Sequence, residues 1–109
     1  MNLENTKAQM RKGILEFCIL SLLQSEAKYA SEILENLKKA EMLVVEGTLY
    51  PLLSRLKNAE LLEYHWEEST SGPPRKYYQI TRQGTEMLTE LEKSWKSLQK
   101  AVNTLVKTK

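Results

Sequence analysis

Hydrophobic residues in the first half of the chain recur with the 3.6-residue period of α-helices. From about Asn5 to Gln24 the chain is rich in helix formers and lacks proline, and its apolar positions widen from one stripe to most of the circumference. We therefore expect this helix to enter the core. Between Tyr29 and Ala40 apolar residues recur at i, i+3, i+4 and i+7, which predicts a second, amphipathic helix after a short connection over residues 25–28.

A third helix is predicted over about Glu46 to Ala59, where leucines again recur at helical spacing. Pro51 has no backbone N–H to donate, so it fits only near the first turn of a helix. The start of this helix is therefore defined only to within two or three residues.

The period changes from helix to strand after Leu61. Apolar and polar residues alternate as Leu62, Tyr64 and Trp66 on one face and Glu63, His65 and Glu67 on the other. Residues 69–74 are typical of a turn and residues 75–81 are again β-rich, so a β-hairpin is predicted. Tyr77 and Tyr78 must point to opposite faces of this hairpin, and Trp66 is expected in the core.

The last helix, for which Thr81 is a suitable N-cap, carries an apolar seam with alternating spacings of three and four residues. The seam residues are Leu88, Leu91, Trp95, Leu98, Val102 and Leu105. Such an a/d heptad seam is typical of a helix that pairs with a second helix, so we expect a homodimer. In the alternative, the helix packs across the first helix of the same chain.

Three helices followed by a two-stranded hairpin form the winged version of the helix-turn-helix. The predicted fold class is mainly α with a small β-hairpin. Residues 1–80 are expected to form a winged helix-turn-helix that binds double-stranded DNA, and residues 81–109 a long C-terminal dimerisation helix, in one compact domain overall.

Four stretches of the chain resemble the PadR family of transcription regulators: residues 10–23, 29–34, 46–56 and 74–84. The strongest signals are Thr-Leu-Tyr-Pro from Thr48 and Arg-Lys-Tyr-Tyr from Arg75. The C-terminal helix is similar to that of the smaller subfamily, which includes multidrug-sensing repressors. The chain departs from the family at Ala30 and Glu60, where glycine is common, and the turn at Glu60 is expected to be less tight than usual.

In a winged helix the third helix enters the major groove, so its outward side chains are the predicted DNA contacts. These residues are Thr48, Tyr50, Pro51, Ser54, Arg55 and Asn58. Arg55 is the first choice for a guanine or phosphate contact and Asn58 for adenine. In the alternative, this is an ordinary solvated face.

Cations outside the third helix are predicted to add contacts to the DNA backbone. Arg75 and Lys76 follow the turn of the hairpin and suit a phosphate or the minor groove, with ion pairs to Glu67 and Glu68 as the competing interpretation. In the first helix, Lys7, Arg11 and Lys12 are further candidates for phosphate contacts, although such charges are more often only solvated.

Trp95 lies in the middle of the seam, a position usually held by leucine or isoleucine. In the multidrug-sensing proteins that the chain resembles, a tryptophan of this helix meets its symmetry mate and sandwiches flat aromatic compounds. The resemblance therefore implies a site for a planar aromatic effector, with Glu92 and Lys96 at its rim. In the alternative, Trp95 is only a large anchor of the dimer interface.

Composition limits the remaining possibilities. A net charge of +2 does not by itself indicate a nucleic-acid binder, so the positive charge must gather on one face. Cys18 is the only cysteine, so the chain has no intramolecular disulfide, which favours the cytoplasm, and no apolar run is long enough to span a membrane. Within its apolar helix Cys18 is expected to be a buried small hydrophobe. His65 has no partner at ligand spacing, so we expect no metal. The sequence contains no Gly-rich phosphate loop, no convincing pair of carboxylates and no Ser-His-Asp set, so we expect no cofactor and no enzymatic activity.

The sequence thus predicts a sequence-specific transcription regulator, most simply a homodimeric repressor of a pseudo-palindromic operator that a flat aromatic molecule releases. One rival is a winged-helix module that binds protein partners and does not read DNA. A second is a regulator without a small-molecule ligand.

Overall fold

The computed structural model describes residues 2–107, so Met1 and residues 108–109 of the predicted C-terminal segment lie outside the described residues. The order of elements is α1 (Leu3–Ser25), β1 (Lys28–Tyr29), α2 (Ala30–Lys39), α3 (Glu46–Asn58), β2 (Leu62–Ser69), β3 (Gly72–Ile80) and α4 (Arg82–Lys107). The predicted fold class, mainly α with a β-hairpin in a winged helix-turn-helix, is confirmed.

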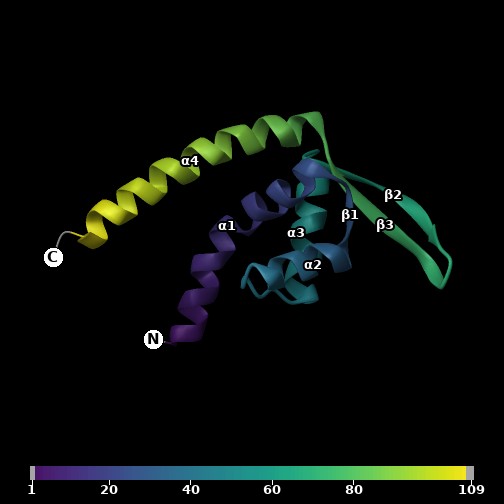
Figure 1. Ribbon diagram of the computed structural model, residues 1–109, viewed down its shortest axis with the longest axis horizontal. Helices are drawn as coiled ribbons and strands as arrows, with labels where there is room; N and C mark the ends of the chain where they lie inside the picture. Colours follow the sequence, from purple (N-terminus) through teal and green to yellow (C-terminus); the bar gives the residue numbers. More distant parts are fainter. Residues whose placement is uncertain (1, 108–109) are drawn as a thin grey trace.

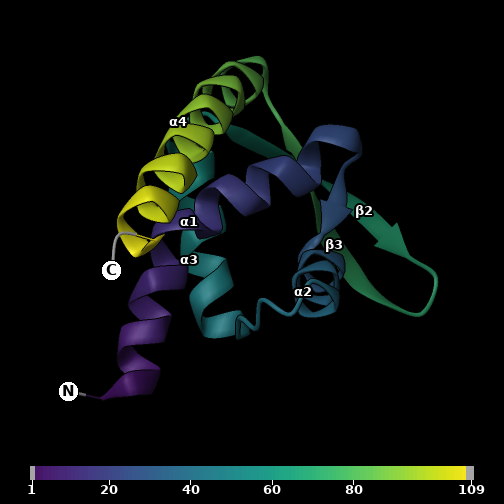
Figure 2. The same cartoon turned by 60° about the vertical axis from the view of Figure 1, so that its left-hand side comes forward.

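The free ends of the two long helices lie on the opposite side of the molecule from the hairpin. In Figure 1, α4 follows one edge of the molecule, α2 and α3 lie between α1 and the sheet, and the β2–β3 hairpin projects away from both chain ends. Figure 2 shows the two termini on the same side in a second view. The molecule therefore presents the hairpin, or wing, at one end and the outer parts of α1 and α4 at the other.

The core forms where all four helices and the sheet meet. Its buried side chains include Ile19, Leu20 and Leu23 of α1, Ile33 and Leu37 of α2, Leu49, Leu53 and Leu56 of α3, Leu62 and Tyr78 of the sheet and Leu88 of α4. Burial of each leucine or isoleucine contributes about 1.5–3 kcal/mol. The prediction that the first helix enters the core is confirmed, because its four buried residues all lie in its C-terminal half.

The sheet has a third strand that the hydrophobic pattern did not indicate. In the strand order β1-β3-β2, Lys28 pairs with Tyr78 and Tyr29 with Tyr77. Two residues are too few to show an alternating pattern, so Lys28 was expected to belong to the connection and Tyr29 to begin the second helix. Tyr78 is buried while Tyr77 lies on the other face of the sheet, as predicted.

The turn of the wing is shorter than residues 69–74. Strand β3 begins at Gly72 and includes both Pro73 and Pro74, which leaves a two-residue turn at residues 70–71. Proline is tolerated in a strand at a bulge or where its N–H would face solvent. The strand has a bulge here, because the pairing register shifts between Glu67 and Ser69. The other edge of β3 is open to solvent beside the prolines, because β1 pairs with β3 only at residues 77–78.

Helices α2 and α3 end in the same tight turn, each with a glutamate in the left-handed conformation. Glu41 and Glu60 both have a φ of 63°. After α3, the Leu61 N–H donates to the Leu56 carbonyl at 2.9 Å and the Glu60 N–H to the Lys57 carbonyl at 3.0 Å, the two bonds of a Schellman motif. The expectation of a less tight turn at Glu60 is wrong, because the hydrogen bonds hold a glutamate where glycine is favoured.

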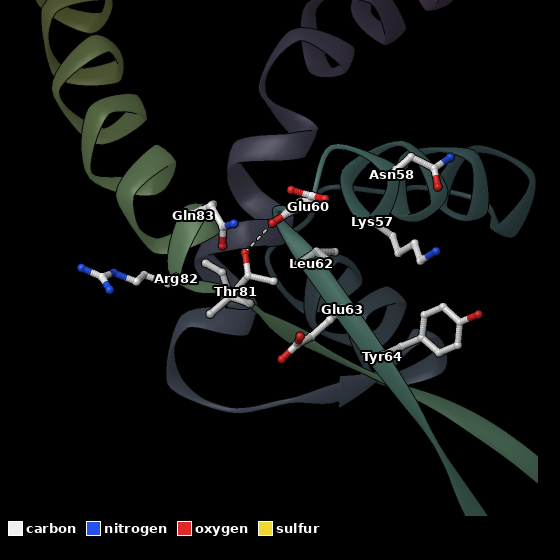
Figure 3. Close-up of a pocket in the computed structure, with 10 residues that line it drawn as sticks. Lys57, Asn58, Glu60, Leu62, Glu63, Tyr64, Thr81, Arg82 and Gln83 are labelled. Atoms are coloured by element: carbon white, nitrogen blue, oxygen red, sulfur yellow. Dashed lines mark hydrogen bonds between the residues drawn. The ribbon is translucent and has the colours of Figure 1, made fainter.

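The start of α4 is fixed against the turn that follows α3. The Thr81 N–H donates to the Leu61 carbonyl at 3.1 Å, and the Thr81 hydroxyl donates to the Glu60 carbonyl at 2.6 Å (Figure 3). The Gly84 N–H donates to Thr81 Oγ1 at 3.0 Å, which confirms Thr81 as the N-cap. A Cβ atom at Gly84 would lie 2.1 Å from the Leu61 carbonyl oxygen, so only glycine allows this approach.

We predict that Gly84→Ala lowers the free energy of unfolding by about 1–3 kcal/mol, because the added methyl group collides with a backbone oxygen that cannot move freely. Gly13→Ala is the matched control: a Cβ there meets nothing within 4 Å, and alanine favours the exposed helix by about 1 kcal/mol. Thermal melts at one protein concentration measure both. A Gly84→Ala variant as stable as the wild type would contradict the close approach.

Candidate nucleic-acid interface

The outward face of α3 carries the predicted DNA contacts. Leu49, Leu53 and Leu56 are buried and fix the rotation of the helix. All six predicted contact residues are exposed: Thr48, Tyr50, Pro51, Ser54, Arg55 and Asn58. Lys57 is exposed as well and was not predicted as a contact. The face is therefore free to enter a groove of DNA.

Pro51 lies in the second turn of α3, because the helix begins at Glu46. It was expected only near the first turn. Proline at this place leaves the Gly47 carbonyl without its i+4 donor. Gly47 and Pro51 are both exposed, so water can satisfy this carbonyl.

Arg55 is held on the side of α3 that faces α1. Its Nη1 atom lies 3.1 Å from Oε1 of Glu16, with 75% of the arginine side chain exposed. An exposed ion pair of this kind contributes only about 0–1 kcal/mol. Arg55 must exchange Glu16 for DNA in order to make the predicted contact, and the weak pair permits that exchange.

Tyr50 lies on the other side of α3, in a cleft between α2, α3 and the wing. The cleft is lined by Tyr29, Ala30, Ser31, Tyr50, Trp66, Pro74, Arg75, Lys76 and Tyr78. It brings Tyr50 together with Arg75 and Lys76, whereas Arg55 is not part of it. Ser31, at the start of α2, is an exposed polar residue of this cleft that sequence reasoning missed.

Aromatic rings hold the cations of the wing in place. Lys76 Nζ lies 4.6 Å from the centroid of the Tyr64 ring, and Lys57 Nζ lies 5.9 Å from the same ring. On the opposite face of the sheet, Arg75 Cζ lies 4.5 Å from the centroid of the Tyr29 ring. Each such contact contributes about 0.5–1 kcal/mol at an exposed site. The cations are thereby oriented without being neutralised.

Glu67, the expected competitor for these cations, is engaged elsewhere. It lies opposite Arg75 in the strand register, but its Oε2 atom accepts a hydrogen bond from the Tyr29 hydroxyl at 2.8 Å. His65 Nε2 lies 3.4 Å from its other oxygen. The hydrogen bond from the Tyr29 hydroxyl is the main cause that lowers the pKa of Glu67, and the hydrogen bond from His65 lowers it further. The bond between Tyr29 and Glu67 also raises the pKa of Tyr29. This contact ties the wing to the residue that precedes α2.

Trp66 is exposed, so the prediction that it lies in the core is wrong. It shares a sheet face with Leu62 and Tyr64, but 61% of its surface is accessible to solvent. Alternation identifies the face of a strand but not how far along the strand the helices still cover it. The cross-strand partner of Trp66 is Lys76, whose Nζ atom lies 5.6 Å from its ring centroid.

The predicted seam of α4 is divided between the core and the surface. Leu88 is 1% exposed and Leu91 packs against the core, so the chain's own residues cover the first part of the seam. The outer part is open: Leu98, Val102 and Leu105 are 54%, 45% and 74% exposed. Packing within the same chain therefore accounts for the first part of the seam, and pairing of the outer part with a second helix stays a prediction.

Trp95 stands at the border between these two parts. Its ring centroid lies 6.5 Å from that of Phe17 in α1. It lines an apolar groove together with Met10, Arg11, Ile14, Leu98, Gln99, Val102 and Asn103. The predicted rim residues Glu92 and Lys96 are not among the lining residues. Arg11, Gln99 and Asn103 provide the polar groups in their place.

The predicted phosphate contacts of α1 lie in different places. Arg11 lines the Trp95 groove, and Lys7 lies 3.9 Å from Glu4. Lys12 and Arg11 both line a second cleft, which reaches Thr48 at the start of α3. No helix among residues 2–107 has the length and hydropathy needed to cross a membrane.

The described residues offer little reactive chemistry. Burial raises the pKa of the Cys18 thiol, which packs against the core, so burial disfavours its thiolate form. Within residues 2–107, the His, Cys, Asp and Glu side chains form no group of three that would hold a metal ion.

Comparison with known proteins gives consistent relatives. The family model described as the transcriptional regulator PadR-like family matches residues 19–90. A PadR-like transcription factor from Bacteroides fragilis is 60% identical with a TM-score of 0.78, over 93% of this chain and 98% of that one. A PadR family transcriptional regulator from Eggerthella lenta is 33% identical with a TM-score of 0.88, over 98% and 94%.

A third solved structure, a PadR-like transcriptional regulator from Bacillus cereus, is 40% identical with a TM-score of 0.80, over 93% of this chain and 99% of that one. The family model covers about two thirds of the chain, including α3, here called the recognition helix, and the wing. The chain therefore belongs to the PadR-like family of transcriptional regulators and is a DNA-binding regulator, not an enzyme.

Proposed function

We propose that this protein is a homodimeric repressor that binds a pseudo-palindromic operator and leaves it when a flat aromatic molecule binds. The observation that carries the proposal is that two exposed surfaces lie on separate parts of the molecule. The exposed face of α3 and the wing form one surface, and the apolar outer parts of α1 and α4 form the other. The first suits DNA and the second suits another copy of the chain.

The dimer is supported by the apolar side chains that a single chain leaves in water. Met10 is 78% exposed beside Leu98 and Val102 in the Trp95 groove, and Leu105 continues the stripe toward the C-terminus. A contiguous apolar surface of this kind is typical of an interface. A two-fold axis beside α4 would direct the α3 helices of the two protomers toward two half-sites of DNA. The proposed repressor requires these two α3 helices to be about 34 Å apart, which is one turn of DNA.

The proposed effector site is the groove beside Trp95. A planar aromatic molecule suits this groove because the indole ring offers a stacking surface and Arg11, Gln99 and Asn103 offer polar contacts. The effector releases DNA only if it binds more tightly to a dimer whose two α3 helices are wrongly spaced.

Fluorescence anisotropy of labelled duplexes tests the main proposal. DNA from upstream of the protein's own gene is compared with a scrambled duplex at two salt concentrations. A repressor binds the first duplex more tightly and loses affinity for both as salt rises. Equal, weak binding to both favours a protein-interaction module, or an operator located elsewhere, which duplexes selected from a random pool would then identify.

We predict that Arg55→Ala weakens binding to the operator by about 1–3 kcal/mol and binding to random DNA by less, because a base contact is lost. Glu16→Gln is the matched control, since it frees Arg55 from its ion pair and leaves operator affinity unchanged or higher. Anisotropy titrations measure both variants. An equal loss on both duplexes would assign Arg55 to a phosphate.

Leu98→Asp combined with Val102→Asp is predicted to give monomers, because two charges would be buried at the interface. These exposed positions are preferred to Leu91, which packs against the chain's own core. Ser97→Asp with Thr104→Asp adds the same charge away from the seam and should remain dimeric. Light scattering measures the mass, and a dimeric Leu98/Val102 variant would place the interface elsewhere.

The fluorescence of Trp95, measured in a Trp66→Phe protein, is predicted to fall when a planar aromatic compound binds. The same compounds should weaken operator binding. Trp95→Ala should abolish their effect on operator binding while DNA binding itself persists. Unchanged fluorescence across a panel of such compounds would favour a regulator without a small-molecule ligand.

A further inference from the structure

The two tryptophans of the chain lie in separate surfaces. Trp95 belongs to the groove between α1 and α4, whereas Trp66 projects from the wing and lines the cleft beside α3. Exposure of 61% leaves much of the Trp66 indole in water, and the wing lies away from the outer part of α4 that the dimer would cover (Figure 1). The dimer proposed above therefore leaves Trp66 uncovered.

Trp66 lies on the sheet face that meets the recognition helix. Its cross-strand partner is Lys76, and Tyr78 of the same face is buried in the core with α3. The ring of Trp66 meets that of Tyr64 edge to face, with centroids 6.2 Å apart at 89°. In Figure 3, Tyr64 and Lys57 project to the same side of β2. The indole is thereby held beside the lysines and the Tyr50 cleft.

The charge of the cleft indicates the partner that fits it. Its lining includes the cations Arg75 and Lys76 and the hydroxyl groups of Ser31 and Tyr50, and no acidic residue among the described residues lines it. This combination of cations, hydroxyls and two exposed aromatic rings, those of Tyr50 and Trp66, suits a polyanion that also has apolar surface. The sugar-phosphate backbone of DNA is such a polymer, because each deoxyribose lies between two phosphates.

We infer that Trp66 packs against a deoxyribose of the strand that crosses between α3 and the wing, while Lys76 contacts the adjacent phosphate. The inference rests on the proposed binding of DNA by α3. A helix in the major groove has a sugar-phosphate strand at the edge of that groove, and the cleft between α3 and the wing receives it. Because sugars are the same in every sequence, Trp66 contributes affinity and not sequence preference.

Acrylamide quenching of two single-tryptophan proteins tests the contact directly. Trp95→Phe retains only Trp66, and Trp66→Phe, the matched control, retains only Trp95. Operator duplex should protect Trp66 from acrylamide severalfold and leave the quenching of Trp95 nearly unchanged. The anisotropy of the labelled duplex, recorded in the same samples, reports whether DNA is bound.

The outcomes separate this inference from the proposed function. If the duplex binds and Trp66 stays as accessible to acrylamide as before, the inference is overturned and the DNA-binding proposal stands. If neither the operator duplex nor the scrambled duplex binds, the inference about Trp66 and the DNA-binding proposal are both overturned. Protection of Trp66 only by a protein from the cell, with no effect of DNA, would assign the cleft to a protein partner and also overturn the inference.

Affinity and its salt dependence give a second test. Trp66→Ala should weaken binding to operator and scrambled duplex alike, by about tenfold. The slope of log affinity against log salt should not change, because no charge is lost. Lys76→Gln should reduce that slope by about one. Circular dichroism checks that both variants fold, and a loss confined to the operator would show that Trp66 reads bases.

Discussion

The carbonyl group of Leu61 is the point on which the arrangement of both surfaces depends. It accepts the Thr81 N–H at 3.1 Å, and Gly84 lies against it so closely that no other residue fits. Leu61 directly follows the turn that ends α3, and Thr81 caps α4. One backbone group therefore links the end of the recognition helix to the start of the helix that carries the proposed dimer surface. Without this contact, α4 would lose its direction relative to α3.

This junction also limits how an effector can act in the proposed repressor. The first turns of α4 are fixed by Leu88 and Leu91 in the core, while the part beyond Trp95 is exposed. In the proposed repressor, a ligand beside Trp95 would therefore act on the packing of the outer part of α4 and, through it, on the angle between the two protomers. Because α3 is joined to α4 at Leu61, a change in that angle moves the two recognition helices apart or together. The effector then selects between dimers of different half-site spacing.

Periodicity predicted the four helices and the hairpin because each element has at least two turns or several alternating residues. It could not predict β1, since Lys28 and Tyr29 are too few to form a pattern. It placed Trp66 on the correct face of its strand but did not predict that the helices leave this residue exposed. It identified the seam of α4, yet spacing does not tell which neighbour covers an apolar residue, and Leu88 proved to be covered by its own chain. The pairing of Arg55 with Glu16 depends on the crossing of α1 and α3, which no local pattern contains.

A net charge of +2 does not by itself indicate a DNA-binding protein, so the local arrangement of the cations matters more than the total charge. Lys57 and Lys76 lie over Tyr64, and Arg75 lies over Tyr29. An aromatic ring orients a cation without cancelling its charge, whereas a carboxylate would do both. Glu67, the carboxylate opposite Arg75, is occupied by Tyr29 and His65. We therefore expect the field that phosphates meet to depend on the few cations held between α3 and the wing more than on the total charge.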